Sequence, residues 1–424
     1  ILKIYTYITL ARRGQKLIRL ELYKLLSKKL LWIGLVLVLF ISFIMFKMRT
    51  PNGELYNYTI VEKLDESGNS YLEHEYESEE PIASTYRERV QAIKKTTDPF
   101  VGKQLNNKLI EDMWRTYYHS DTPVLYNSLD ETPFDGFLYH FINFETPEYL
   151  EKMGYDYFSF EVGGKTSYIQ TADSFCDAND ISKPLTFSYG EGWSMILKNM
   201  YLSLVAGLLL VITLAGTVFS GEYRYRMIGQ MLSTKNGRQK LFASKIVAML
   251  LVTILIYGII WMFNILLCGS LFGLEGFKTN MTFIGASQFY FYADLSDTIG
   301  ELVLRYGIVG FVVYCTVSLI TMVFSSLFEN ELSSTILAVL IFMTPALFIS
   351  FFITMFPEKV VKLLRVLPPN IFQIRQTSTN AEWTWTTHQI GEVPLWIIIS
   401  TAYIVVTFIG VIFLMLRAKS IQDK

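Results

Sequence analysis

The sequence contains few of the side chains on which most enzymes and metal proteins depend. Its 424 residues include three cysteines and four histidines, and only 18% are Asp, Glu, Lys or Arg. The cysteines stand alone in separate regions, which argues against a disulfide framework. The histidines lack the spacing of metal ligands, and neither G-x-S-x-G nor H-E-x-x-H occurs. We therefore expect no catalytic residue and no metal site in this chain.

The sequence also lacks a complete nucleotide-binding loop. Residues Val162–Thr166 read V-G-G-K-T, like the end of a phosphate-binding loop. That motif requires a glycine five positions before Gly164, where this sequence has Ser159. We expect the chain to bind no cofactor directly and to have no ATPase activity of its own.

Long apolar runs are what the sequence has instead. Hydrophobic residues make up 51% of the chain, and six runs are long enough to cross a hydrocarbon layer of about 30 Å, which takes about 20 helical residues. The pattern predicts a polytopic α-helical membrane protein. We expect its six transmembrane helices at Leu30–Phe46, Met200–Phe219, Ile246–Phe272, Tyr306–Phe328, Leu332–Phe356 and Val393–Leu416.

The interiors of these runs contain no Asp, Glu, Lys, Arg or His. Pumps and ion-coupled carriers need ionisable groups within the membrane, so we expect the energy source to lie elsewhere. Thr213, Thr217 and Thr344 are candidates for a substrate path along the second and fifth spans. The alternative is that these hydroxyls form hydrogen bonds between helices, and the sequence leaves both possibilities open.

Basic and acidic residues are separated along the chain. Residues 1–29 contain eight Lys or Arg, residues 220–245 contain six and residues 417–424 contain three, whereas residues 50–194 contain 26 acidic and 11 basic residues. Because basic loops stay in the cytoplasm, both termini are predicted to be cytoplasmic and the acidic segment extracellular. A nucleic-acid surface would need basic and aromatic side chains together in a soluble groove, so this charge pattern argues against one.

The same pattern divides the chain into regions. We expect an extracellular domain that is separately folded and mainly helical. Apolar residues at helical spacing after Pro81, and again from Val101 to Tyr117, predict helices there, while Tyr157–Gln170 predicts a hairpin that turns at Gly163 and Gly164. The expected regions are a cytoplasmic tail with an interfacial helix at 1–29, the first span at 30–46, the extracellular domain at 47–197, and the other five spans at 198–424 with a cytoplasmic loop at 220–245.

The segment before the first span has the pattern of a helix that lies on the membrane surface. Its apolar residues fall on one helical face and its lysines on another. Glu21 and Lys24 are its candidate contact residues. The apolar face consists of Ile18, Leu22, Leu25 and Leu26.

The loop between the second and third spans is similar to one in a known family. The residues that carry the similarity are Glu222, Tyr223, Ile228, Leu232, Ser233, Arg238 and Lys245. In type and spacing they resemble the cytoplasmic loop of ABC-2 type exporter permeases, and Ile18–Leu26 resembles that family's interfacial helix. The sequence departs from the family at Arg226 and Met227, where a Gly-Thr pair is usual. The resemblance covers the membrane half of the chain and leaves out the extracellular domain.

This resemblance implies a permease subunit that works with a separate cytosolic ABC ATPase, which would bind ATP and Mg. It also implies a second permease copy or a paralogue, contact with membrane lipids, and export of an amphipathic peptide, a lipid-like molecule or an antibiotic, in a bacterial cell membrane. The ATPase-coupling residues that it suggests are Glu222, Tyr223, Arg224, Arg226, Arg238 and Lys245.

A second function remains open at this stage. A membrane immunity or sensor protein that transports nothing could use the same spans as an anchor and bind a peptide at its outer domain. A polytopic membrane enzyme is the weakest alternative, because no nucleophile, base or metal ligands gather at one membrane face.

Overall fold

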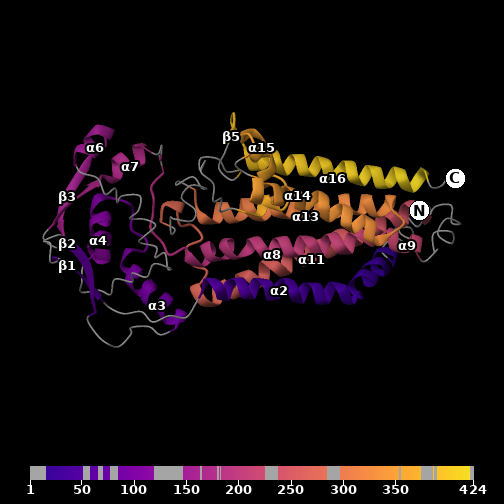
Figure 1. The fold of residues 1–424 in the computed structure, drawn as a ribbon, viewed down its shortest axis with the longest axis horizontal. Coiled ribbons are helices and arrows are strands. Elements are labelled where there is room, and N and C mark those ends of the chain that lie inside the picture. The colour runs from indigo at the N-terminus through magenta and orange to yellow at the C-terminus, as the bar shows by residue number, and fades with distance from the viewer. Residues whose placement is uncertain are drawn as a thin grey trace, which may run out of the picture.

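The molecule is an elongated helical bundle with a mixed domain at one end (Figure 1). The computed structural model describes residues 16–50, 58–64, 70–76, 85–118, 147–162, 165–178, 181, 183–224, 237–283, 297–352, 355–373, 385 and 389–420. The last described residue, Ser420, lies at the end of the bundle opposite the domain, and so does the N-terminal helix of residues 16–26. We call these the domain end and the terminal end.

Six helices are long and apolar enough to cross a membrane, as the sequence predicts. They are α2 (Lys29–Arg49), α8 (Glu191–Gly216), α11 (Gly237–Phe272), α13 (Ile299–Leu327), α14 (Glu331–Phe352) and α16 (Leu395–Ser420). Several begin before the apolar run does, because a helix continues until its end groups are satisfied. In α13, Thr298 accepts from the backbone N–H of Glu301 (3.2 Å), and the Glu301 carboxylate accepts from the N–H of Thr298 (2.9 Å).

Helix α8 is the centre of the bundle. It packs against α2, α11, α13 and α14, and 67% of its most apolar stretch is buried, against 17% for α14. Helix α16 packs on α13 and α11 at the side. Most of α14 and α16 therefore faces outward, where large apolar side chains suit lipid.

A polar cluster joins α2, α8 and α11 inside the apolar bundle. Ser42 Oγ donates to Asn264 Oδ1 (2.9 Å), and Asn199 Nδ2 donates to the same oxygen (2.8 Å). All three side chains are buried, and Asn199 Oδ1 has no hydrogen-bond partner among the described residues. Such bonds hold membrane helices together because the surrounding side chains and lipid offer no other partner.

The domain at the other end contains more β structure than the sequence suggests. Its helices are α3 (Tyr86–Thr97), η1 (Asp98–Phe100), α4 (Asn107–Tyr118), α6 (Pro147–Met153) and α7 (Ala172–Ala178). Two antiparallel hairpins accompany them, β1 (Tyr58–Leu64) with β2 (Ser70–Tyr76) and β3 (Tyr157–Val162) with β4 (Lys165–Gln170). The second hairpin confirms the predicted one, whose turn lies outside the described residues. The first was missed, so "mainly helical" is an incomplete description of the domain.

Helix α4 begins later than the apolar spacing suggests. The spacing starts at Val101, but the helix starts at Asn107, because the Asn106 side chain accepts from the N–H of Leu109 (2.8 Å) and caps it. Val101 lies in an exposed turn. The inner face of α4 packs on β3, where Trp114 meets the Phe160 ring edge to face.

The domain is attached to α8 and α11 at the domain end of the bundle. The Lys94 ammonium of α3 pairs with Glu275, and the Tyr86 ring meets Phe272, the last residue of α11, at 5.9 Å. The backbone N–H of Thr186 donates to Asn280 Oδ1 (3.2 Å). These contacts tie the polar domain to the helix bundle rather than leaving it on a free linker.

Shorter elements complete the described fold. They are α9 (Ser220–Arg224), η2 (Met281–Phe283), α15 (Glu358–Arg365), η4 (Asn370–Phe372), β5 (Gln389–Ile390) and β6 (Val393–Pro394). The amphipathic α15 and the β5 hairpin lie at the domain end, beside α16 (Figure 1).

The polar cluster makes a testable contribution to stability. Replacing Asn264 with Leu removes the oxygen to which Ser42 and Asn199 donate, and it should lower the free energy of unfolding by about 1–2 kcal/mol. Thermal unfolding in detergent measures this. The control is Ser270→Ala on the same helix, because Ser270 is exposed and bonds to its own helix at Leu267. Equal effects of the two variants would contradict the assignment.

Candidate functional site

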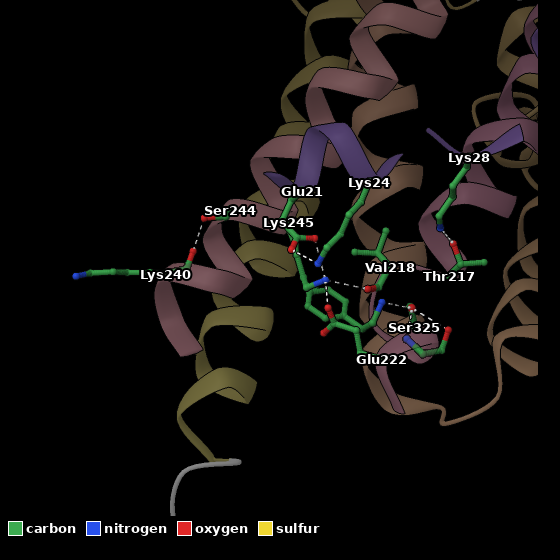
Figure 2. A network of polar contacts seen from close by, with 12 residues as sticks. Glu21, Lys24, Lys28, Thr217, Val218, Glu222, Lys240, Ser244, Lys245 and Ser325 are labelled. Atoms are coloured by element: carbon green, nitrogen blue, oxygen red, sulfur yellow. Dashed lines mark hydrogen bonds and ion pairs between the residues drawn. The ribbon is translucent and has the colours of Figure 1, made fainter. Parts of the chain in front are cut away.

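A buried lysine lies at the terminal end of the bundle, where three separate segments meet. Lys245 of α11 has a side chain that is only 3% exposed. Its Nζ is 3.1 Å from Glu21 Oε2 and 2.5 Å from Glu222 Oε1. It also donates to the backbone carbonyl of Val218 (3.3 Å). Figure 2 shows Lys245 between the two carboxylates, and we call these three side chains the Lys245 triad.

The helix of residues 16–26 supplies the first carboxylate. Glu21 and Leu25 are buried on its inner face, and the outward Lys24 Nζ lies 2.7 Å from Glu21 Oε1. The two residues are one helical turn apart, the spacing at which opposite charges pair. Each Glu21 oxygen therefore faces a different ammonium group.

A break between α8 and α9 supplies the second carboxylate. Helix α8 ends at Gly216, and α9 restarts at Ser220, which turns Glu222 toward Lys245. Three serine hydroxyls donate to the Gly216 carbonyl. They belong to Ser220 (2.6 Å), Ser325 of α13 (2.7 Å) and Ser334 of α14 (2.8 Å).

The backbone N–H groups at the break have hydrogen-bond partners as well. Ser325 Oγ accepts from the backbone N–H groups of Phe219 and Ser220, both at 3.0 Å. Groups that a helix end leaves unpaired thus find partners in α13 and α14. A larger residue at 216 would crowd α14, because a Cβ there would stand 2.3 Å from Thr335 Oγ1.

The two neighbouring lysines stabilise the charged form of Glu21. Burial alone would raise the pKa of Glu21, but the neighbouring Lys245 and Lys24 ammonium groups outweigh this and hold it below its ordinary value of 4.5. Because the folded-state pKa is below the unfolded one, this pairing stabilises the fold above about pH 4.5. The stabilisation is lost as the pH falls through the lowered pKa.

The site has the features of a mechanical joint. Each charge is paired within the protein, and the residues that the structure describes include no group of three or more potential metal ligands. What the triad does is lock the helix of residues 16–26, α9 and α11 into one unit.

The structure brings together four of the residues singled out from the sequence: Glu21, Lys24, Glu222 and Lys245. The sequence placed the first two in an interfacial helix and the last two in a docking loop, and it gave no sign that they pair with each other. The rest are described only in part or not at all: Tyr223 and Arg224 by their backbone in α9, Arg238 by its backbone in the first turn of α11, and Arg226 outside the described residues. The burial of Lys245 makes it an internal link rather than a surface contact.

The three candidate path residues do not form a cluster of free hydroxyls. Thr213 of α8 and Thr217, the residue that follows α8, donate to the carbonyls of Leu209 (2.7 Å) and Leu214 (2.8 Å) of α8. Thr344, on the exposed face of α14, donates to its own Leu340. Their role in a substrate path stays a prediction.

Sequence reasoning missed the serines around Gly216. Ser220, Ser325 and Ser334 lie in separate helices, and serine is common enough that no local signal marks it. The one available sign was their position. Each lies close to the end of a predicted span that the charge pattern places on the cytoplasmic side.

A comparison with protein families identifies what this arrangement belongs to. A family model described as ABC-2 family transporter protein matches residues 15–418. The chain belongs to this family. The match extends through the polar domain and so goes beyond the membrane half to which the loop and the N-terminal helix pointed. No curated protein matches the sequence significantly.

Membership fixes the broad role of the chain. ABC-2 permeases are membrane subunits of ABC transporters and associate with an ABC ATPase. The six apolar helices fit such a multi-pass membrane subunit.

The Lys245 triad should contribute strongly to stability. Replacing Lys245 with Met leaves two buried carboxylates without their cation, which should cost about 3–5 kcal/mol. Replacing Lys240 with Met is the matched control, because Lys240 lies on the same helix and is exposed. Thermal unfolding of both variants in detergent makes the comparison. A Lys245 variant as stable as the Lys240 variant would contradict the structural role of the triad.

Proposed function

We propose that the chain is the permease subunit of an ATP-driven ABC exporter and that its terminal end receives the ATPase. The observation that carries this proposal is the Lys245 triad. It joins the N-terminal helix to both sides of the basic segment of residues 220–245, the two elements that resemble the ATPase-contacting parts of the family.

The terminal end is the cytoplasmic end in this proposal. Residues 1–29, 220–245 and 417–424 contain 17 basic residues in all, and each described part of them lies at the terminal end (Figure 1). Basic loops are retained in the cytoplasm. The polar domain, acidic in sequence, is then extracellular.

The ion pairs of the Lys245 triad would couple the ATPase to the membrane helices. The ATPase would contact the candidate residues Arg224, Arg226 and Arg238. Movement at that contact would pass through Glu222 and Lys245 to Glu21, and the N-terminal helix would move with it. A contact transmits nucleotide-driven movement only when it holds in both states, and buried ion pairs meet that requirement better than exposed ones.

Helix α11 extends this connection across the bundle. It has 36 residues, which at 1.5 Å per residue gives a length of roughly 54 Å. Lys245 lies about two turns after its first residue, Gly237, and the ring of Phe272, its last residue, meets Tyr86 of the polar domain. A tilt of α11 would therefore reach the polar domain directly.

The substrate is proposed to be an amphipathic peptide, a lipid-like molecule or an antibiotic, exported by two permease copies or by a pair with a paralogue. Uncharged spans suit such a molecule better than a small ion. Thr213, Thr217 and Thr344 are proposed to face its path. The immunity or sensor function remains the alternative, and it requires no ATPase at all.

Arg238→Glu tests the docking of the ATPase. Glu222→Lys would place a second ammonium group beside Lys245 and disturb the fold, so Arg238 offers the cleaner change. With the ATPase co-expressed, its recovery with the variant should fall roughly tenfold, while membrane insertion stays normal. Lys278→Glu makes the same charge change on an exposed residue at the domain end and should have no effect. Normal export and normal copurification by Arg238→Glu would contradict the docking role.

The acidic domain gives a second test, of substrate selection. Residues 50–194 have 26 acidic and 11 basic residues, and this field should concentrate cationic peptides at the exit. The full-length protein in neutral-lipid nanodiscs should bind a cationic amphipathic peptide, and the affinity should fall as salt rises above about 0.15 M, where the screening length is about 8 Å. An anionic peptide of equal length is the control. Salt-independent binding, or none, would leave the domain without a role in selection.

A further inference from the structure

A pocket of about 490 Å³ opens beside the Lys245 triad. It lies between the N-terminal helix, the first turn of α2, the break between α8 and α9, and the start of α14. Its charged lining comprises four lysines and three glutamates, and its apolar lining comes from three aliphatic side chains. The lining residues outside the triad that matter for binding are Lys28, Lys29, Glu331 and Leu30.

The lysines of this pocket outnumber its glutamates. Lys24 and Lys245 form ion pairs with Glu21, and Lys245 also forms an ion pair with Glu222. Lys28 is half-buried, and its hydrogen-bond partner is the neutral Thr217 hydroxyl at 2.6 Å. Within the described part of the chain, neither Lys28 nor Lys29 forms an ion pair. Glu331 also lines the pocket, but no ion pair joins it to Lys28 or Lys29 among the described residues, so these two ammonium groups are open to an anion.

The electrostatics of Lys28 agree with this. Burial lowers the pKa of Lys28 below its ordinary value, although the charge of Glu331 acts in the opposite direction. The ammonium group has lost water, and the nearby charges of Glu331 and Glu21 do not make up for that loss. An anion in the pocket would offset that loss.

The pocket also lies at the edge of the proposed membrane span. Helix α2 begins at Lys29, and on its surface Leu30 is 44% and Trp32 is 51% exposed. Tryptophan is enriched at the membrane interface, and lysines near a span end attract anionic headgroups. A molecule that enters here meets cations on one side and an apolar helix surface on the other.

We propose that this pocket binds an anionic phospholipid, with the phosphate group against Lys28 and Lys29 and the acyl chains along the outer face of α2. The leaflet would be the cytoplasmic one, and this part of the inference rests on the orientation given under the proposed function. The lipid would then touch Thr217, the first residue after α8, and so lie against the break that positions Glu222. Its phosphate would be held outside the triad itself.

Lipid binding to the purified full-length chain tests this. We would measure the affinity for phosphatidylglycerol and phosphatidylcholine by native mass spectrometry from detergent. Lys28→Gln and Lys29→Gln should each weaken phosphatidylglycerol binding roughly fivefold. Lys29→Gln changes an exposed side chain and so avoids a folding defect. Lys47→Gln is the control, since Lys47 is an exposed lysine at the other end of the same helix.

Each other outcome overturns the proposal in a defined way. Unchanged binding by the Lys28 and Lys29 variants, or an equal loss with Lys47→Gln, would show that the pocket is not the site. Equal affinity for phosphatidylcholine would mean that the anionic headgroup is not recognised. Competition by millimolar inorganic phosphate would assign the pocket to a free anion. The assay uses neither the ATPase nor transport, so its failure would leave the proposed function intact.

Discussion

The terminal end of this protein depends on the ammonium group of Lys245. A buried cation costs several kcal/mol in lost hydration unless carboxylates replace the water. Here the replacements come from Glu21, before the first span, and from Glu222, after the second, while Lys245 itself opens the third. Three distant parts of the chain are thus forced to meet. Apolar side chains of similar volume could give equal stability, but they would slide past one another more easily.

The helix break next to the triad, between α8 and α9, depends on different groups. It is held by neutral hydroxyl groups at one carbonyl, that of Gly216, and these come from α9, α13 and α14. Hydrogen bonds of this kind contribute about 1 kcal/mol each and can exchange. The terminal end therefore combines a charged joint that resists separation with a neutral one that can be rearranged, and Glu222 lies just beyond the second.

Features that depend on one short stretch of sequence could be predicted, whereas contacts between residues far apart in the sequence could not. The six spans were predictable because a continuous apolar run of about 20 residues is a local property. The β1–β2 hairpin was not, because the acidic composition of residues 58–76 hides a weak alternation. The residues of the triad were each recognised from their own segment. Their pairing could not be, because it joins residues 224 positions apart and nothing local specifies which distant carboxylate a lysine will meet.

The described hydrogen bonds also rank the spans by how firmly they are held. Helices α2, α8 and α11 share the cluster of Ser42, Asn199 and Asn264, and α13 is tied to α16 through Thr316 and Thr407 (2.8 Å). In the described part of α14, the side-chain bond to another helix is that of Ser334 to Gly216, at the terminal end. Thr344, further along, is satisfied within α14 itself.

Among the described residues, α14 is therefore the span with the fewest side-chain hydrogen bonds to other helices. It is also the least buried of the six, so its displacement exposes little apolar surface that lipid does not already cover. In the part of the chain that the structure describes, its side-chain hydrogen bond to another helix is the one from Ser334 to the Gly216 carbonyl, at the break between α8 and α9. A change at that break acts on α14 at its end, and a small rotation there becomes a larger displacement at the far end of a 22-residue helix. The fold thus places its least buried span in direct contact with a helix break whose Gly216 carbonyl accepts from three neutral hydroxyl groups.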